Sequence, residues 1–118
     1  MHMIDLVDEL ASKLGVAIFP RGGLSFISTN DFEKIVYACL DHNYLILGIE
    51  AFTLSENATI PLMDYIADYS DLYRHDTWEE ACKIAVESAI MYYQGLKNRN
   101  EVYFDFVIVR PGEAIPTI

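Results

Sequence analysis

The residues 63–80, MDYIADYSDLYRHDTWEE, bring together the side chains of this chain that are best suited to chemistry. They include six carboxylates, three tyrosines and one tryptophan, against a single arginine. Such a mixture can form a solvated surface, a metal site or a surface that binds a basic protein. In the last case the rings supply rigid contact area, and the carboxylates supply steering and charge-assisted hydrogen bonds.

The spacing within this segment predicts a helix over residues 61–74, with Pro61 in its first turn. On such a helix Asp64, Asp68 and Asp71 form one stripe, which Tyr65 flanks. The core-facing stripe would consist of Leu62, Ile66, Tyr69 and Tyr73. Carboxylates four residues apart on a helix repel by about 0.2–0.5 kcal/mol, and a basic partner would relieve that repulsion.

A partner-binding surface is therefore one interpretation of the segment, and a solvated acidic face is the other main one. The residues that we predict to bind the partner are Asp64, Tyr65, Asp68, Asp71, Asp76, Glu79 and Glu80. A metal site through Asp71, His75 and Asp76 is less favoured, because the sequence shows no second cluster of ligands. We predict no cofactor.

Glu50 and Asp105 form a second candidate site. Each interrupts a strongly apolar segment, residues 44–53 and 102–110, and both segments are rich in strand-forming residues. If the two strands are neighbours, the carboxylates can lie close together, where proximity separates their pKa values and allows acid–base chemistry. The alternative is that each carboxylate lies at the rim of a sheet and accepts hydrogen bonds there.

The other signatures of an enzyme are missing from the sequence. It contains no G-x-S-x-G, G-x-G-x-x-G or G-x-x-x-x-G-K-[ST] pattern, so it predicts neither an activated serine nor a phosphate-binding loop. We therefore predict a binding protein rather than an enzyme. A small enzyme or ligand-binding protein that uses Glu50 and Asp105 remains the alternative.

The composition limits the partners. A formal net charge of −10, from 18 acidic and 8 basic residues, disfavours nucleic acid and anionic membranes and favours basic proteins. The N-terminal residues resemble no signal peptide, and no apolar run approaches the ~18 residues of a membrane span. We expect a cytoplasmic protein in which Cys39 and Cys82 remain buried thiols.

Apolar periodicity outlines one α/β (α+β) domain over residues 1–118. We expect a sheet of three to four strands packed with three to four helices. Besides 61–74, the expected helices cover residues 4–14, 30–43 and 77–95, the last opened by a capping box at Thr77–Glu80. The expected strands cover residues 16–19, 24–27, 44–53 and 102–110.

The succession LILGIEAF, PLMDYIADYSDL, a Trp-led helix and YFDFVIV resembles small bacterial immunity proteins of polymorphic toxin systems, including contact-dependent growth inhibition systems. In those proteins a helix leads into an "LG" strand, and a Trp-led helix precedes a final "YF" strand. Leu47-Gly48, Trp78 and Tyr103-Phe104 occupy these places here, and the resemblance covers about residues 25–109.

The resemblance implies a cytoplasmic protein that binds one toxin domain and blocks it. Many such toxins are nucleases with basic active sites, and a strongly acidic inhibitor suits them by electrostatic steering. The expected partner is thus a basic cognate toxin, bound by a monomer or homodimer of this chain.

Overall fold

The computed structural model describes residues 5–99 and 101–112, and within them the chain forms three α-helices and five strands. The α+β class predicted from the sequence is confirmed, with one strand more than the expected three to four. The elements are α1 (Leu6–Leu14), β1 (Phe19–Arg21), β2 (Leu24–Ser28), the 3₁₀ helix η1 (Thr29–Asp31), α2 (Phe32–Asp41), β3 (Leu45–Leu54), β4 (Thr59–Asp68), the 3₁₀ helix η2 (Ser70–Arg74), α3 (Trp78–Gln94) and β5 (Val102–Val109).

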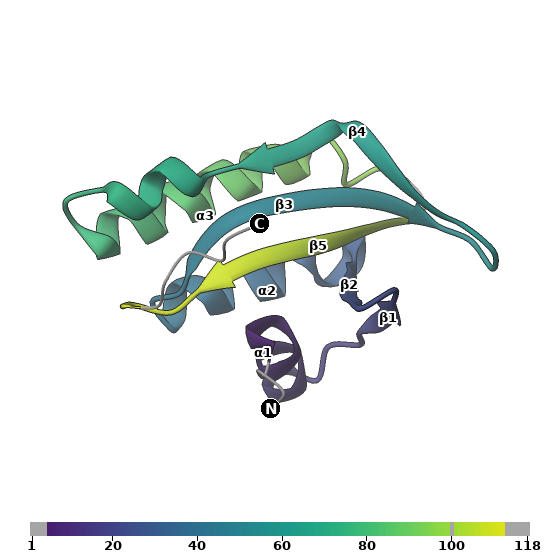
Figure 1. Cartoon of the computed structure of the whole chain (residues 1–118), viewed down its shortest axis with the longest axis horizontal. Helices are drawn as coiled ribbons and strands as arrows, with labels where there is room; N and C mark the ends of the chain where they lie inside the picture. The colour runs from purple at the N-terminus through teal and green to yellow at the C-terminus, as the bar shows by residue number, and fades with distance from the viewer. Residues whose placement is uncertain (1–4, 100, 113–118) are drawn as a thin grey trace.

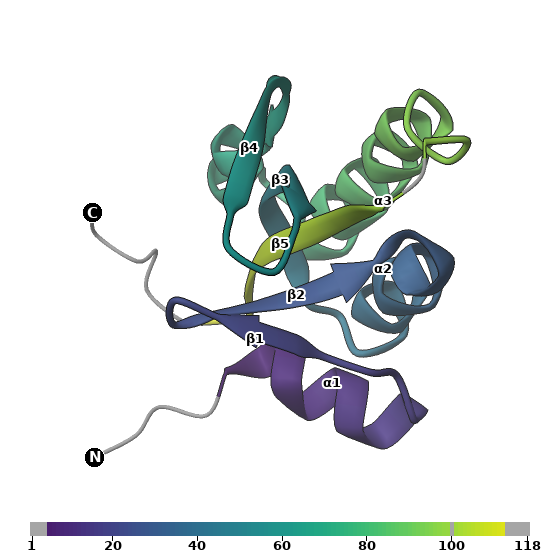
Figure 2. The same cartoon turned by 90° about the vertical axis from the view of Figure 1, so that its right-hand side faces the viewer.

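The five strands form one antiparallel sheet in the order β1-β2-β5-β3-β4, so the last strand of the chain lies at its centre. Helices α2 and α3 cover one face of this sheet (Figures 1 and 2). Helix α1 packs against α2 and β5. Because β5 pairs with β2 only through Ile27 and Ser28, α1 lies beside the part of β5 that β2 leaves unpaired.

The helix expected over residues 4–14 is present as α1, which begins two residues later, at Leu6. The Asp5 side chain accepts a hydrogen bond from the Val7 amide at 2.8 Å and caps α1, and Gly15 ends that helix with φ of 70°. The strand expected at residues 16–19 is displaced, since β1 starts only at Phe19. It pairs with β2 in a hairpin, whose turn needs the positive φ values that Gly22 and Gly23 adopt. The capping box at Thr77 is wrong, since the Thr77 side chain makes no capping hydrogen bond.

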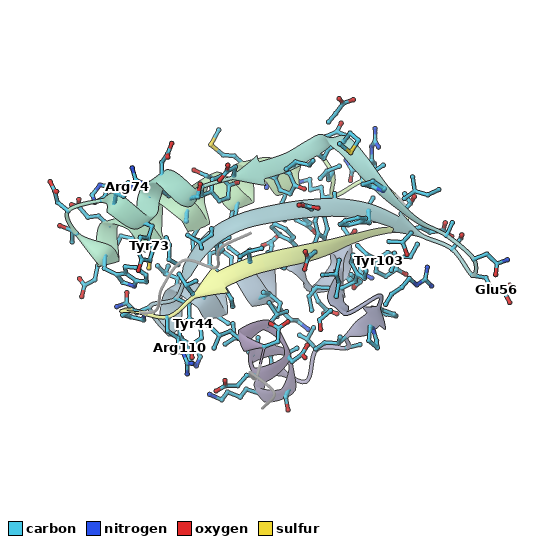
Figure 3. The ribbon with its side chains drawn as sticks, viewed as in Figure 1. Tyr44, Glu56, Tyr73, Arg74, Tyr103 and Arg110 are labelled. Carbon is cyan, nitrogen blue, oxygen red and sulfur yellow. The ribbon has the colours of Figure 1, made fainter. Side chains whose placement is uncertain are left out.

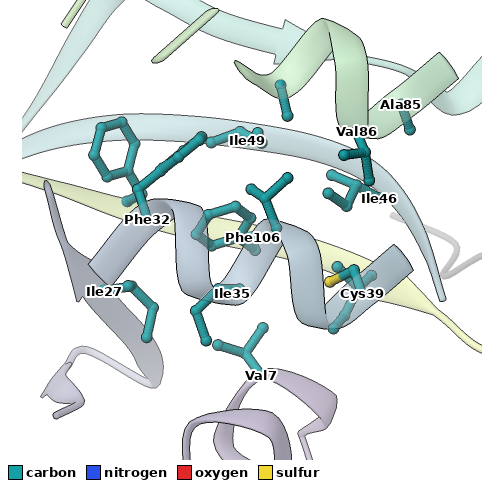
Figure 4. Close-up of a cluster of buried hydrophobic side chains, with 14 of the residues drawn as sticks. Val7, Ile27, Phe32, Ile35, Cys39, Ile46, Ile49, Ala85, Val86 and Phe106 are labelled. Carbon is teal, nitrogen blue, oxygen red and sulfur yellow. The ribbon is translucent and has the colours of Figure 1, made fainter. Parts of the chain in front are cut away.

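The core lies between the sheet and its helices, and Phe32, at the start of α2, is one of its buried members (Figure 4). The Phe32 ring is fully buried, stacks on Tyr93 of α3 at 4.6 Å and meets Phe104 of β5 edge-on at 4.7 Å. The same ring lies 5.2 Å from that of Phe106. Phe32 therefore joins both helices of the layer to the central strand.

The predicted helix over residues 61–74 is wrong. Residues 59–68 form strand β4 at the edge of the sheet, and η2 follows. Pairing with β3 satisfies the backbone on one side of β4, and the register holds Glu50 opposite Ile66 but Phe52 opposite Pro61. Four residues of β4, 62–65, therefore lie opposite the single residue Ala51 and form a bulge. Because a bulge interrupts the two-residue alternation of a strand, the apolar residues of β4 can have the spacing that is typical of a helix.

Among the described residues no helix is long and apolar enough to cross a membrane.

Replacing Phe32 with alanine tests its place in the core. We expect Phe32→Ala to lower the free energy of unfolding by about 3–5 kcal/mol, because the emptied site adjoins several rigid rings. Tyr37→Ala, on the exposed side of the same helix, should change it by less than about 1 kcal/mol. Urea denaturation followed by circular dichroism measures both, and equal effects of the two substitutions would contradict this account of the core.

Candidate functional site

Glu50 of β3 and Asp105 of β5 lie directly opposite each other in the sheet. Their sequence neighbours Ile49, Ala51 and Phe104 are buried in the core, so the alternation of a strand turns both carboxylates to the face away from α2 and α3. The hypothesis of an acid–base pair required the two strands to be neighbours. They are neighbours, and they bring the two carboxylates together.

Strand β4 adds two more carboxylates to the same face. Tyr65 and Ala67 pack against the core, whereas the alternate residues Asp64, Ile66 and Asp68 are exposed. Asp64 and Asp68 are thus both exposed, although a strand rather than the predicted helix carries them, and Asp64 lies within the bulge. We define the open face as the six outward residues Glu50, Asp64, Ile66, Asp68, Asp105 and Val107.

A hollow of ≈ 360 Å³ lies within the open face. The residues lining it are Leu47, Gly48, Ile49, Glu50, Ile66, Ala67, Asp68, Ser70, Asp105 and Val107. Gly48 lies opposite Val107 on one side and Asp68 on the other, and a Cβ at Gly48 would come within 3.1 Å of the Ala67 carbonyl oxygen. The glycine therefore lets β3 and β4 approach closely and leaves the floor of the hollow without a side chain.

The carboxylates of the hollow have unequal surroundings. Burial, then the neighbouring Glu50 and Asp5 carboxylates, raise the pKa of Asp105 to about 6. Asp5 is near because α1 lies along β5 and Asp5 caps that helix. Hydrogen bonds from Ser70, including its backbone amide at 2.9 Å, lower the pKa of Asp68, so this carboxylate remains charged.

No lysine, arginine or histidine lines the hollow among the described residues. The ion pairs found in that part of the chain join Lys13 to Glu9, Lys34 to Asp31 and His75 to Glu80, all outside the open face. Two arginines are engaged elsewhere. Arg21 donates to the carbonyl oxygens of Ser55 and Ala58 at the tip of the β3–β4 hairpin, and Arg99 lies over the Tyr65 ring at 4.9 Å.

The remaining predicted residues lie apart from the open face. Tyr65 is half-buried, and its carbonyl oxygen accepts a 2.6 Å hydrogen bond from the Tyr92 hydroxyl, so it joins β4 to α3. The other predicted carboxylates are exposed along the segment from η2, which carries Tyr73 and Arg74 (Figure 3), to the start of α3. These carboxylates are Asp71, Asp76, Glu79 and Glu80.

Other chemistry finds little support. No group of three or more potential metal ligands occurs among the described residues, the suggested Asp71, His75 and Asp76 included. Burial raises the pKa of Cys39 to about 12 and that of Cys82 to about 11, so both thiols remain protonated at neutral pH and are poor nucleophiles.

Sequence reasoning missed the apolar part of the open face. Ile66 is 48% exposed and Val107 is 42% exposed, yet Ile66 was assigned to the core stripe of a helix. A usable signal was present, because in the strand pattern Ile66 stands between two aspartates that must face outward.

Comparisons of the sequence with protein-family models and curated proteins, and of the chain with solved structures, found no match. The functional assignment therefore rests on the residues of the open face.

The raised pKa of Asp105 makes stability depend on pH. An unfolded aspartate titrates near 3.9, so between about pH 4 and 6 the folded chain retains a proton that the unfolded chain has lost. The free energy of unfolding is therefore not reduced by Asp105 below pH 4, and it falls as the pH rises through 6. We expect Asp105→Asn to stabilise the protein by about 1–2 kcal/mol at pH 7.5, after allowance for solvent screening, and hardly at all at pH 4.

Thermal unfolding at the two pH values measures this difference. Asp41→Asn removes a carboxylate from the exposed end of α2 and is the matched control, with little effect expected at either pH. A stabilisation by Asp105→Asn that is the same at pH 4 and pH 7.5 would show that the carboxylate charge is not its cause.

Proposed function

We propose that this chain is an immunity-type protein that binds and neutralises a basic protein toxin in the cytoplasm. The observation that carries the proposal is the open face, where three carboxylates line the hollow and no basic side chain of the described residues does so. Exposed Ile66 and Val107 give this face apolar contact area as well as charge. The resemblance to immunity proteins of polymorphic toxin systems points in the same direction.

The physical basis is electrostatic complementarity. A face with one sign of charge raises the association rate with a partner of the opposite sign and disfavours partners of the same sign. The net charge of −10 extends the attraction beyond the contact itself and opposes binding to nucleic acid. Carboxylates that occupy a phosphate-binding surface would block a nuclease without any catalysis by this chain, which we take to act as a monomer or homodimer.

A small enzyme or ligand-binding protein is the second candidate. The observation that favours it is the pairing of Glu50 with Asp105 within the hollow, where the pKa of Asp105 reaches about 6. Two carboxylates with different proton affinities can act as acid and base. No activated nucleophile accompanies them in the described residues, so binding remains the better supported function.

The proposal predicts that this chain protects a cell from the protein encoded by the neighbouring reading frame. We expect co-expression to restore growth that this protein alone prevents, and the purified pair to form a complex. Growth arrest that co-expression does not relieve, or a neighbour without toxicity, would contradict the proposed function.

Charge reversal on the open face should weaken the complex. We expect Asp64→Lys with Asp68→Lys to leave the fold intact and to reduce affinity by 10- to 100-fold, about 1.4–2.8 kcal/mol. Asp41→Lys with Glu87→Lys, both exposed on the helical layer, changes the net charge equally and is the control. Calorimetry on the folded variants decides, since equal losses in both would assign the effect to net charge rather than to this face.

A further inference from the structure

The open face is a sheet surface that the described part of the chain leaves uncovered. Helices α2 and α3 pack on the opposite face, and α1 packs beside β5 (Figures 1 and 2). Ile66 and Val107 stand exposed there, on strands that flank β3 from either side. Aliphatic side chains at such positions offer a partner contact area near the middle of the sheet.

The hollow between these side chains is lined by both apolar and acidic residues. One row of the sheet carries Ile66, Glu50 and Asp105, and the next carries Asp68, Gly48 and Val107, so apolar surface at Gly48 and Val107 adjoins the carboxylates of Glu50 and Asp105. Asp68 is held by its hydrogen bond from the Ser70 amide, so its position is fixed before a partner arrives. An apolar wall beside clustered carboxylates matches a side chain with an aliphatic stem and a cationic head.

We infer that the open face docks a basic segment of the partner protein and that one arginine or lysine side chain of this segment enters the hollow. The inference rests on the proposed function and names the contact that anchors it. The stem packs over Gly48 beside Val107, and the cationic head lies between Glu50 and Asp105, with Ile66 and Asp68 at the rim of the hollow. A second copy of this chain is disfavoured as the occupant, because it carries the same four carboxylates and a net charge of −10.

The docked cation also removes an unfavourable interaction. Glu50 and Asp105 oppose each other across β3 and β5, and residues 5–99 and 101–112 place no basic side chain in the lining of the hollow. A cation held between them turns repulsion into attraction. Binding should therefore be tighter above pH 7 than below pH 5, where Asp105 holds a proton. The other charged groups near Asp105 are Glu50 on β3, Asp68 on β4 and Asp5 at the cap of α1.

A small peptide probes the hollow without the toxin. We would titrate the ¹⁵N-labelled full chain with acetyl-Gly-Arg-Gly-amide and, separately, with the citrulline peptide, its neutral isostere. We expect saturable amide shifts at Gly48, Ile66 and Val107 for the arginine peptide, with a dissociation constant of about 1–10 mM. Equal shifts from the citrulline peptide, or shifts confined to other residues, would overturn the inference.

Matched variants separate the hollow from general charge. Glu50→Gln with Asp105→Asn should weaken the arginine peptide at least about fivefold, whereas Asp41→Asn with Glu87→Gln should change it less than about twofold. The spectra of both variants also show whether they are folded. Equal weakening by both pairs would assign the binding to long-range charge and would overturn the inference.

The same variants distinguish this inference from the proposed function. If the wild-type chain protects against the toxin and Glu50→Gln with Asp105→Asn binds it as tightly as wild type, the function stands and the hollow is not the anchor. If the wild type does not protect, the proposed function fails. A dissociation rate that rises tenfold or more in the double variant, with the association rate nearly unchanged, would support a side chain seated in the hollow.

Discussion

The antiparallel pairing of β3 with β5 is the constraint on which the rest of this molecule depends. The pairing runs from Leu45 opposite Val109 to Thr53 opposite Val102. It places the last strand of the chain, β5, between β3 and β2, which both precede it in the sequence. Both strands present apolar side chains to the helices, so the pairing and the core form together. Because the partners are far apart in sequence, closing this pair carries a large loop entropy that local interactions cannot offset alone.

The helices explain why only one face of the sheet is apolar throughout. The buried stripe of α2 and the alanine-rich side of α3 pack against the inward residues of β3 and β5, with Phe32 filling the space between them. Once that side is covered, the alternation of the strands leaves Glu50 and Asp105 on the other side. The carboxylate pair is thus a direct consequence of the register that buries the core, since a slip of one residue in either strand would turn the carboxylate of that strand inward.

The carboxylates of the open face lower the free energy of unfolding, and the packing of the core offsets this loss. Opposed carboxylates with an added burial penalty at Asp105 lower the stability of the monomer at neutral pH. Replacing either with a neutral residue would make a more stable sheet, and proteins commonly retain such local conflicts at sites that bind. The hydrogen bond from Ser70 to Asp68 and the bulge in β4 likewise shape this face more than they strengthen the fold.

The sequence by itself determined the helices at 6–14, 32–41 and 78–94, the strands around Gly48 and Phe104 and the acidic character of the molecule, because those features follow from local spacing and charge. Only the tertiary structure decided that residues 59–68 are a strand, since Leu62 to Tyr73 fit a helical period equally well until β3 offers a paired edge. Likewise only the register of β3 on β5 places Glu50 opposite Asp105, in a hollow that Asp68 also lines. The reason is that the whole core, and not the residues that flank either carboxylate, sets the pairing of strands that are distant in sequence.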